Sequence, residues 1–280
     1  MLIVGELALE AGADPAALQV LPCDNAVAEA LATDSRVRVM SFTGSAKVGW
    51  MLKTRVAGKA VLELGGNAAA IVCADANLDD AAKRLAASAF GYAGQVCIKV
   101  QRIIVEAPVY DAFDGKLREQ KIAAGDPARE DTVLGPVIDD RSADRIEAWV
   151  KEAGGAVKRN GRLIEPVILT NVPRSAKAWS EEIFGPVVCL AKAASFDEAL
   201  RLVNDSQYGL QASIFTNDLS KARRAFHELD VGGVIVNDAP SLRSDNQPYG
   251  GNKASGLGRE GVRYAMEDFT EPRAVVTARG

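Results

Sequence analysis

The chain is poor in the residues that most often carry acid–base and metal chemistry. It has a single histidine, His227, and four cysteines at positions 23, 73, 97 and 189. The sequence contains no CxxC pair and no Cys/His cluster, so it predicts neither a metal site nor a disulfide framework. Isolated thiols of this kind are typical of a reducing compartment, and we expect the protein in the cytoplasm.

Charge and hydropathy exclude two classes of partner. The formal net charge is -4 and no long Lys/Arg run occurs, which argues against nucleic acid and anionic membrane surfaces. Apolar runs are strand-sized and interrupted, so no membrane span is predicted. The first residues lack a basic leader and include Glu6 and Glu10, unlike a signal peptide.

Length and composition predict a globular α/β protein. A chain of 280 residues, 48% hydrophobic and 25% charged, can bury a large core and form one large or two ordinary domains. Short β-branched runs alternate with helical stretches, without internal repeats or low-complexity linkers. This alternation is typical of a mostly parallel sheet covered by helices.

One strand–turn–helix pattern is suited to holding a phosphate group. Residues 37–42 predict a strand, residues 43–45 a turn, and residues 46–56 a helix. The N–H groups and positive dipole end at such a helix start favour a pyrophosphate, and Gly44 lets the backbone approach closely. The full GxGxxG fingerprint is absent, and by itself the pattern is better explained by a tight turn in which Ser45 caps the helix.

Periodicity and capping residues predict the other elements. Apolar residues at helical spacing indicate a helix over 78–92, with Asn77 as its cap and one face in the core. The stretch 238–261 is long, glycine-rich and aperiodic, which is typical of a functional loop. The remaining predictions are helices at 2–11 (ending at Gly12), 25–33 (capped by Asp24), 139–153, 196–204 and 219–229, and strands at 60–64, 68–73, 100–105 and 233–237.

Cys97 is the first candidate for chemistry. It follows Gly94-Gln95-Val96 in a loop between a helix end and a strand. A protease-like Cys–His pair would have to recruit His227, which lies in an amphipathic segment that predicts a surface position. Cys73 and Cys189 lie in apolar runs and are predicted to be buried core thiols.

Glu63 is the second candidate. It lies between Leu62 and Leu64 at a predicted strand end, before Gly65-Gly66. Flanking leucines would desolvate the carboxyl group, raise its pKa and suit it to activate water. An exposed glutamate at a strand end explains the pattern equally well.

Two later motifs have both a functional and a structural explanation. In Glu182-Ile183-Phe184-Gly185-Pro186 the acid could hold ribose hydroxyls and the aromatic ring could pack on a planar ring, or the segment could be a simple turn. The segment 248–261 is dense in glycine and could be a structural loop.

Taken together and in this order, these motifs resemble the NAD(P)-dependent aldehyde dehydrogenase superfamily over nearly the whole chain. The resemblance implies an α/β, aldehyde dehydrogenase-like fold with a partial Rossmann-like cofactor domain and an α/β catalytic domain on a mostly parallel sheet. It divides the chain into residues 1–65 for the cofactor, residues 66–256 for catalysis, and residues 257–280 as a C-terminal helix and oligomerisation strand.

The resemblance also assigns roles. Cys97 matches the nucleophile that forms a thiohemiacetal and then a thioester with a small aldehyde, and its N–H would donate to the oxyanion. Glu63 matches the base that activates the deacylating water. No metal is implied. The positions that match the NAD- or NADP-binding residues are Thr43, Gly44, Ser45, Gly49, Leu64, Glu182 and Phe184.

The loop 237–249 resembles the lactaldehyde and phosphonate- or sulfonate-aldehyde branch of the family. In that branch Arg243 would hold an anionic group of the substrate. A CoA-acylating activity is disfavoured because it does not need Glu63. The tail segment 273–277 predicts a strand that pairs with a partner subunit, in a homodimer or homotetramer.

Two features depart from the family pattern. Family members carry an N-terminal segment with an oxyanion-hole asparagine and the first strands of the cofactor domain, and we expect this chain to lack it. The alternative to an active enzyme is therefore a catalytically impaired fragment that retains the fold. Lys99 replaces a small or hydroxyl residue; in an extended chain it would point the same way as Cys97 and favour the thiolate, unless it simply faces solvent.

Overall fold

The larger part of the molecule is built on a six-stranded parallel sheet. The computed structural model describes residues 1–278. Every neighbouring pair in this sheet is parallel, which confirms the predicted α/β class. The strand order is β11 (Gly233–Val236), β10 (Gln211–Phe215), β3 (Ala69–Val72), β4 (Arg102–Glu106), β8 (Val187–Ala193) and β7 (Val167–Thr170).

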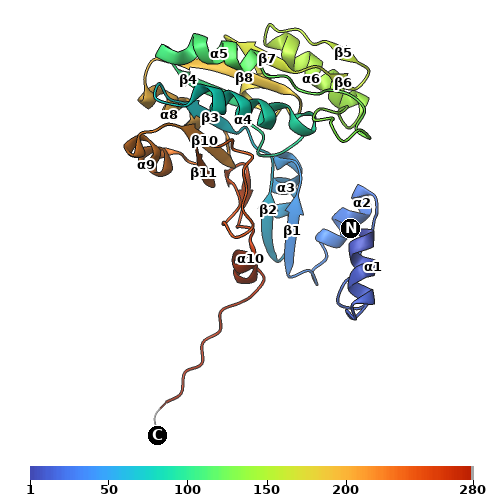
Figure 1. Ribbon diagram of the computed structural model, residues 1–280. Coiled ribbons are helices and arrows are strands. Elements are labelled where there is room, and N and C mark those ends of the chain that lie inside the picture. Colours follow the sequence, from blue (N-terminus) through green and yellow to red (C-terminus); the bar gives the residue numbers. More distant parts are fainter. Residues whose placement is uncertain (279–280) are drawn as a thin grey trace.

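Helices cover both faces of this sheet (Figure 1). On one face, helices α4 (Leu78–Phe90) and α5 (Tyr110–Arg118) pack on Val72 and Ile103. On the other face, helices α8 (Phe196–Asn204) and α9 (Leu219–Glu228) pack on Ile71 and Ile104. Because successive side chains of a strand point to opposite faces, strands buried on both sides are continuously apolar. Helices α6 (Asp140–Glu152) and α7 (Lys177–Ser180) pack near β7 and β8.

A smaller three-stranded sheet precedes the large one. Parallel strands β1 (Val39–Thr43) and β2 (Lys59–Glu63) are joined through α3 (Ala46–Lys53), and β13 (Gly256–Leu257) pairs antiparallel with β2. The predicted strand–turn–helix pattern is thus confirmed. The division of the chain at residues 65 and 256 stays a prediction.

Local signals located most helix starts correctly. The side chains of Asp24 and Asn77 accept hydrogen bonds from N–H groups of their own first turns, as predicted. These caps begin α2 (Asn25–Ala32) and α4. The first helix, α1 (Leu2–Glu10), also lies where it is predicted.

The structure differs from prediction around the Cys97 loop. Helix α4 ends at Phe90 rather than residue 92, because Tyr92 and Ala93 adopt left-handed backbone angles in the 3₁₀ turn η1 (Gly91–Gly94). Strand β4 begins at Arg102 rather than residue 100, since the Val100 N–H donates to the Ser88 hydroxyl instead of to a neighbouring strand.

The C-terminal region forms little regular structure. The loop 238–261 contains only the two-residue strands β12 (Asn252–Lys253) and β13, and helix α10 (Val262–Asp268) follows. The segment 273–277 extends away from the rest of the molecule (Figure 1) and forms no strand within residues 1–278, so its predicted pairing with a partner subunit stays a prediction. Residues 279–280 of the predicted C-terminal region lie outside the described residues.

The other short elements are η2 (Ala107–Val109), the hairpin strands β5 (Arg159–Asn160) and β6 (Leu163–Ile164), and β9 (Tyr208–Gly209), which pairs with β12. Among residues 1–278, none of the helices combines the length and apolarity needed to cross a membrane.

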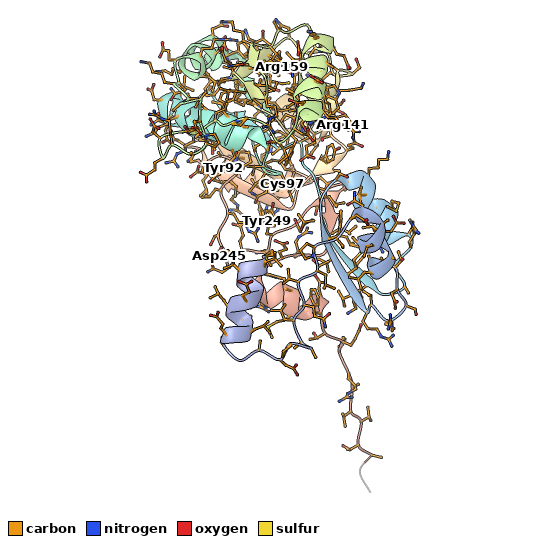
Figure 2. The ribbon with its side chains drawn as sticks, turned by 90° about the vertical axis from the view of Figure 1, so that its right-hand side faces the viewer. Tyr92, Cys97, Arg141, Arg159, Asp245 and Tyr249 are labelled. Carbon is orange, nitrogen blue, oxygen red and sulfur yellow. The ribbon has the colours of Figure 1, made fainter. Side chains whose placement is uncertain are left out.

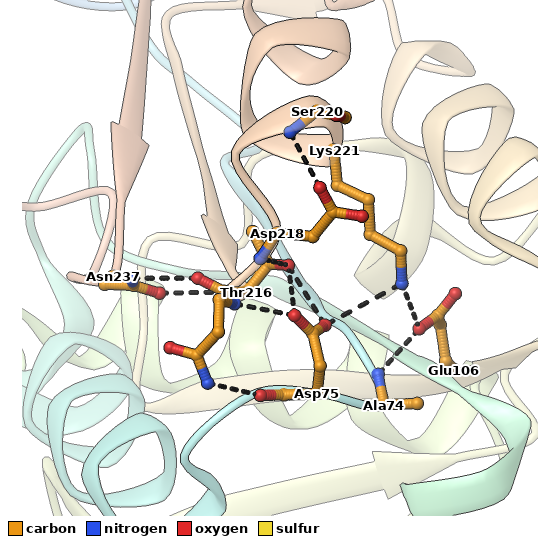
Figure 3. A network of polar contacts seen from close by, with 9 residues as sticks. Ala74, Asp75, Glu106, Thr216, Asp218, Ser220, Lys221 and Asn237 are labelled. Carbon is orange, nitrogen blue, oxygen red and sulfur yellow. Dashed lines mark hydrogen bonds and ion pairs between the residues drawn. The ribbon is translucent and has the colours of Figure 1, made fainter.

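A polar network lies at the carboxyl ends of four strands of the large sheet (Figure 3). Asp75, after β3, accepts hydrogen bonds from the Thr216 hydroxyl at 2.8 Å and the Asn217 N–H at 2.7 Å. Lys221 donates to Glu106 at the end of β4, at 3.0 Å. The side chain of Asn237, after β11, both donates to and accepts from the backbone of Thr216.

Candidate active site

The candidate residues meet where the small sheet joins the large one. Strand β2 ends at Glu63, and five residues separate it from the start of β3 at Ala69. A Cβ at Gly66 would lie 2.6 Å from the carbonyl oxygen of Cys97, so only glycine lets these two segments approach this closely. Figure 2 shows Cys97 and Tyr249 close together at this junction.

A second glycine joins the Cys97 loop to the motif at 182–186. Gly94 has a φ of +66°, and a Cβ there would overlap the Gly185 carbonyl. The Gly-Gln turn and the Phe-Gly-Pro turn therefore pack backbone against backbone. Motifs that are about 90 residues apart in the chain thus form one site.

Cys97 is half-buried between polar groups. Its Sγ lies 3.3 Å from the Tyr249 hydroxyl. Burial raises the pKa of the thiol, the Tyr249 hydrogen bond lowers it, and the charges of Glu182 and Glu63 raise it further. Within residues 1–278 the Cys97 N–H has no acceptor, so it can donate to an oxyanion at this position.

Glu63 is a buried carboxyl group without a full set of donors. It is 5% exposed, and its Oε1 has no hydrogen-bond partner among the described residues. Burial and the nearby charge of Glu260 raise the pKa of Glu63 to about 8, although Arg243 and Arg259 lower it. The predicted desolvated carboxyl is confirmed, and its deprotonated form, which predominates above about pH 8, can accept a proton from water.

Glu182 contacts the Gly65-Gly66 segment, and Phe184 follows Glu182 two residues later in the chain. The Glu182 Oε1 accepts a hydrogen bond from the Gly66 N–H at 3.0 Å. Burial raises the pKa of Glu182, while the Gly66 N–H and the charges of Lys99 and Arg145 lower it. Phe184 has a φ of +45°, an unusual value for a bulky residue that sets the direction of its ring.

The start of α3 comes to the same junction. The Gly44 N–H donates to the Glu63 carbonyl at 3.1 Å, which ties the turn after Thr43 to the end of β2. Ser45 caps α3 by accepting from the Val48 N–H, and the first turn carries no acidic residue. Its remaining N–H groups can therefore bind an anion.

Gly49 sets the distance between α3 and the segment after β2. A Cβ at Gly49 would overlap the side chain of Leu64. The helix consequently packs directly on Leu64, which is 2% exposed. Six of the seven positions assigned to a cofactor by resemblance, all except Phe184, thus have contacts or neighbours at the same junction.

The prediction that Lys99 favours the Cys97 thiolate is wrong. The chain turns at 97–99 rather than extending, and Lys99 donates to the Val187 carbonyl. Its pKa is lowered to about 7 by burial, against the charges of Cys189 and Glu182. Nor does Lys99 face solvent, because it is only 3% exposed.

Arg243 lies close to the site but is already paired. Its guanidinium lies 4.0 Å from the centre of the Tyr249 ring and 3.0 Å from a carboxylate oxygen of Glu260. The sequence reasoning missed Tyr249 as a neighbour of Cys97. The sequence did offer one signal for this contact. Tyr249 in the Tyr-Gly-Gly motif carries a hydroxyl that can form a hydrogen bond, which a phenylalanine at this position could not do.

A cleft of about 930 Å³ opens beside the Cys97 loop. Tyr92, Ala93 and Val96 form its wall on the Cys97 side, and Asp238 and Ser241 lie opposite on the 238–261 loop. A small molecule in this cleft would lie next to the thiol-bearing turn.

The remaining candidates have ordinary positions. Cys73 and Cys189 are buried in the core and His227 is exposed on α9, as predicted. Among the described residues, no group of three or more His, Cys, Asp or Glu side chains is arranged to hold a metal ion.

Comparison with known proteins decides the family. The model of the aldehyde dehydrogenase family matches residues 1–275. The chain belongs to the aldehyde dehydrogenase family. It is 46% identical over 286 residues to 3-sulfolactaldehyde dehydrogenase of Priestia aryabhattai, covering 98% of this chain and 60% of that protein. The chain therefore spans about 60% of the length of this relative.

Solved structures of the family share the fold. Aldehyde dehydrogenase 21 from Physcomitrella patens, in complex with the reaction product succinate, matches with a TM-score of 0.86 and 46% identity over 90% of this chain and 55% of that one. Glyceraldehyde-3-phosphate dehydrogenase from Methanocaldococcus jannaschii, complexed with NADP, matches with a TM-score of 0.82 and 38% identity over 86% of this chain and 55% of that one.

Proposed function

We propose that the protein oxidises an aldehyde to the carboxylic acid with NAD⁺ or NADP⁺. The observation that carries this proposal is the convergence of a nucleophile, Cys97, and a buried carboxyl group of raised pKa, Glu63, at one junction between two sheets. Family membership supports the same reaction.

The residues at the junction fit a dinucleotide. The free N–H groups at the start of α3 would hold the pyrophosphate, Glu182 would accept from the ribose hydroxyls, and Phe184 would pack beside the nicotinamide. When bound, the nicotinamide supplies a two-electron hydride acceptor. In this proposal residues 1–65 serve mainly the cofactor and residues 66–256 the aldehyde.

The protein's own groups divide the reaction into two stages. The deprotonated Cys97 sulfur adds to the carbonyl carbon, and the Cys97 N–H donates to the oxygen that becomes negative. Loss of hydride from that carbon leaves a thioester on Cys97. Glu63 then takes a proton from water, the resulting hydroxide attacks the thioester, and the carbon–sulfur bond breaks to release the acid.

The substrate we favour is an aldehyde that carries an anionic group. Arg243 is 40% exposed and lies over the ring that contacts Cys97, so it presents positive charge near the nucleophile. A relative named for 3-sulfolactaldehyde supports a negatively charged substrate. A bidentate contact from arginine suits a sulfonate, phosphonate or carboxylate.

The test is NAD(P)H formation with a panel of neutral and anionic aldehydes. We expect turnover that Cys97→Ala abolishes and that the control Cys23→Ala, at an exposed thiol, leaves unchanged. Turnover that survives in Cys97→Ala would contradict the proposal. Absence of turnover, with Cys97 still reactive toward an alkylating reagent, would favour the impaired fragment instead.

We also infer a homodimer or homotetramer. Val262 and Met266 on helix α10, and Phe269 directly after it, are more than half exposed, at 80%, 63% and 55%. Apolar residues so exposed on and next to one short helix are typical of a surface that a further subunit covers. Light scattering coupled to size exclusion would give the mass, and a monomer at micromolar concentration would contradict this inference.

A further inference from the structure

Tyr249 contacts the sulfur of Cys97 from the loop 237–249, in which only Arg243 has so far been given a role. The two atoms lie 3.3 Å apart, and Tyr249 is only 5% exposed. Among residues 1–278 its hydroxyl has no other hydrogen-bond partner. A buried phenol hydroxyl normally finds a partner, and here that partner is the nucleophile itself.

Apart from the hydrogen bond of Tyr249 and a smaller contribution from the Ile98 N–H, the surroundings of the sulfur oppose its negative form. Burial disfavours the thiolate, and the carboxyl groups of Glu63 and Glu182 face it. Lys99 is directed to the Val187 carbonyl, and the only histidine lies exposed on α9. The side-chain hydrogen bond that favours the thiolate is therefore the one from Tyr249.

Three features position Tyr249 and keep its hydroxyl protonated as a hydrogen-bond donor. Its backbone forms an isolated β-bridge with Glu260, whose carboxylate pairs with Arg243 at 3.0 Å. The Arg243 guanidinium lies 4.0 Å above the Tyr249 ring, where a cation draws electron density from the phenol and strengthens its O–H as a donor. Burial and the neighbouring Cys97 charge raise the pKa of Tyr249 well above its usual range, so the phenol keeps its proton.

We propose that Tyr249 is a catalytic residue whose hydroxyl donates a hydrogen bond to the Cys97 sulfur and stabilises the thiolate, with Arg243 as its positioning residue. No proton leaves the phenol in this role. The place of Tyr249 in aldehyde oxidation rests on the proposed function, whereas its effect on the sulfur does not.

The test measures alkylation of Cys97 by iodoacetamide as a function of pH, followed at that residue by mass spectrometry. Tyr249→Phe removes only the hydroxyl, so the midpoint should move to higher pH and the rate below the midpoint should fall about tenfold. The control Tyr208→Phe removes a half-buried hydroxyl that donates to Glu181 instead, and its profile should match that of the unaltered protein.

A second variant keeps the result interpretable if Tyr249→Phe folds poorly. Arg243→Met retains the hydroxyl and removes the cation over the ring, and we expect a smaller shift in the same direction, about threefold in rate. An unchanged alkylation profile in either folded variant would overturn the proposal.

The aldehyde assay separates this inference from the proposed function. Slower alkylation together with a lower kcat and a nearly constant KM in Tyr249→Phe would support both. Slower alkylation in a protein that oxidises no aldehyde would sink only the proposed function. Normal alkylation in a protein that does oxidise aldehydes would sink only the role of Tyr249.

Discussion

The two ends of the large sheet carry polar clusters of opposite character. At the carboxyl ends of the strands, Asp75 and Glu106 are each matched by hydrogen-bond donors and by the charge of Lys221. At the amino ends, Glu63 is buried with an unpartnered oxygen, and Cys97 faces carboxyl groups. The first cluster is saturated, whereas the second has unused capacity for hydrogen bonds.

The pKa values of Asp75 and Glu63 move in opposite directions for this reason. Burial alone would raise the pKa of Asp75, but hydrogen bonds from Thr216 and Asn217 and the charge of Lys221 lower it. For Glu63 burial is joined by the charge of Glu260, and the pKa rises to about 8. A satisfied cluster stabilises the fold, and an unsatisfied one leaves a carboxyl group ready to take a proton.

The position of the reactive cluster follows from the smaller sheet. Ligands of open α/β sheets bind outside the carboxyl ends of the strands. The site lies at the amino ends of the six-stranded sheet, but Thr43 and Glu63 are the carboxyl ends of β1 and β2. The site therefore lies at the carboxyl ends of the strands of the smaller sheet, where ligands normally bind. The larger sheet contributes the loops that precede its own strands.

The largest expected effect removes the proposed base, Glu63, from the reactive cluster. Glu63→Gln keeps the shape of the side chain but cannot take a proton, so hydrolysis of the thioester should slow by about 10²–10⁴-fold. Intact-protein mass spectrometry should then detect the acyl-enzyme on Cys97. The matched control is Glu165→Gln, at an exposed position, and equal hydrolysis rates in the two variants would exclude Glu63 as the base.

The same substitution should change the pH dependence of stability. The folded-state pKa of Glu63, about 8, lies above its ordinary value of 4.5, so the folded protein binds the extra proton between these values. The free energy of unfolding should therefore fall as pH rises from about 4.5 to 8. At pH 9 Glu63→Gln should be more stable than the parent by on the order of 2 kcal/mol, allowing for solvent screening. Urea titrations at pH 5 and pH 9 measure this; a constant difference between the proteins would contradict it.

In the saturated cluster, loss of the acceptor should lower the stability of the protein, whereas Glu63→Gln should raise it at high pH. Asp75→Ala leaves donors at Thr216 and Asn217 without an acceptor and should cost about 1–2 kcal/mol of unfolding free energy, while Cys97 alkylation stays normal. Because the pKa of Asp75 is lowered, this cost should disappear as pH falls and the parent carboxyl becomes protonated. Asp79→Ala, which breaks only the exposed pair with Lys116, is the control, and equal losses would refute the distinction.

The smallest expected effect tests the charge beside Glu63. Glu260→Gln removes a negative neighbour and releases Arg243 from its pair, and both changes lower the pKa of Glu63. The acidic midpoint of thioester hydrolysis should move down by about half a pH unit. Hydrolysis of an activated ester across pH measures it, and a midpoint that rises would show that Glu260 acts in another way.

Local signals predicted much of the fold and of the site. The βαβ unit, the caps at Asp24 and Asn77, the core face of α4 and the burial of Glu63 all depend on residues close together in the chain. Side-chain spacing and capping chemistry determine these features without long-range information.

Features that depend on distant segments could not be predicted in the same way. The contact between Cys97 and Tyr249 joins residues 152 positions apart. The direction of Lys99 depends on the Val187 carbonyl of a strand formed much later in the chain. Whether the tail 273–277 pairs as a strand with a partner subunit stays a prediction, because a strand needs a neighbour and none within residues 1–278 borders this segment.

The sequence by itself determined the α/β class and the family, and it predicted the nucleophile and the base, because these follow from periodicity and from motifs in a set order. The tertiary structure alone decided which groups surround the Cys97 sulfur and which polar clusters are saturated. Hydrogen-bond donors and charges act over a few ångströms in space, and that distance is set by packing rather than by position in the chain.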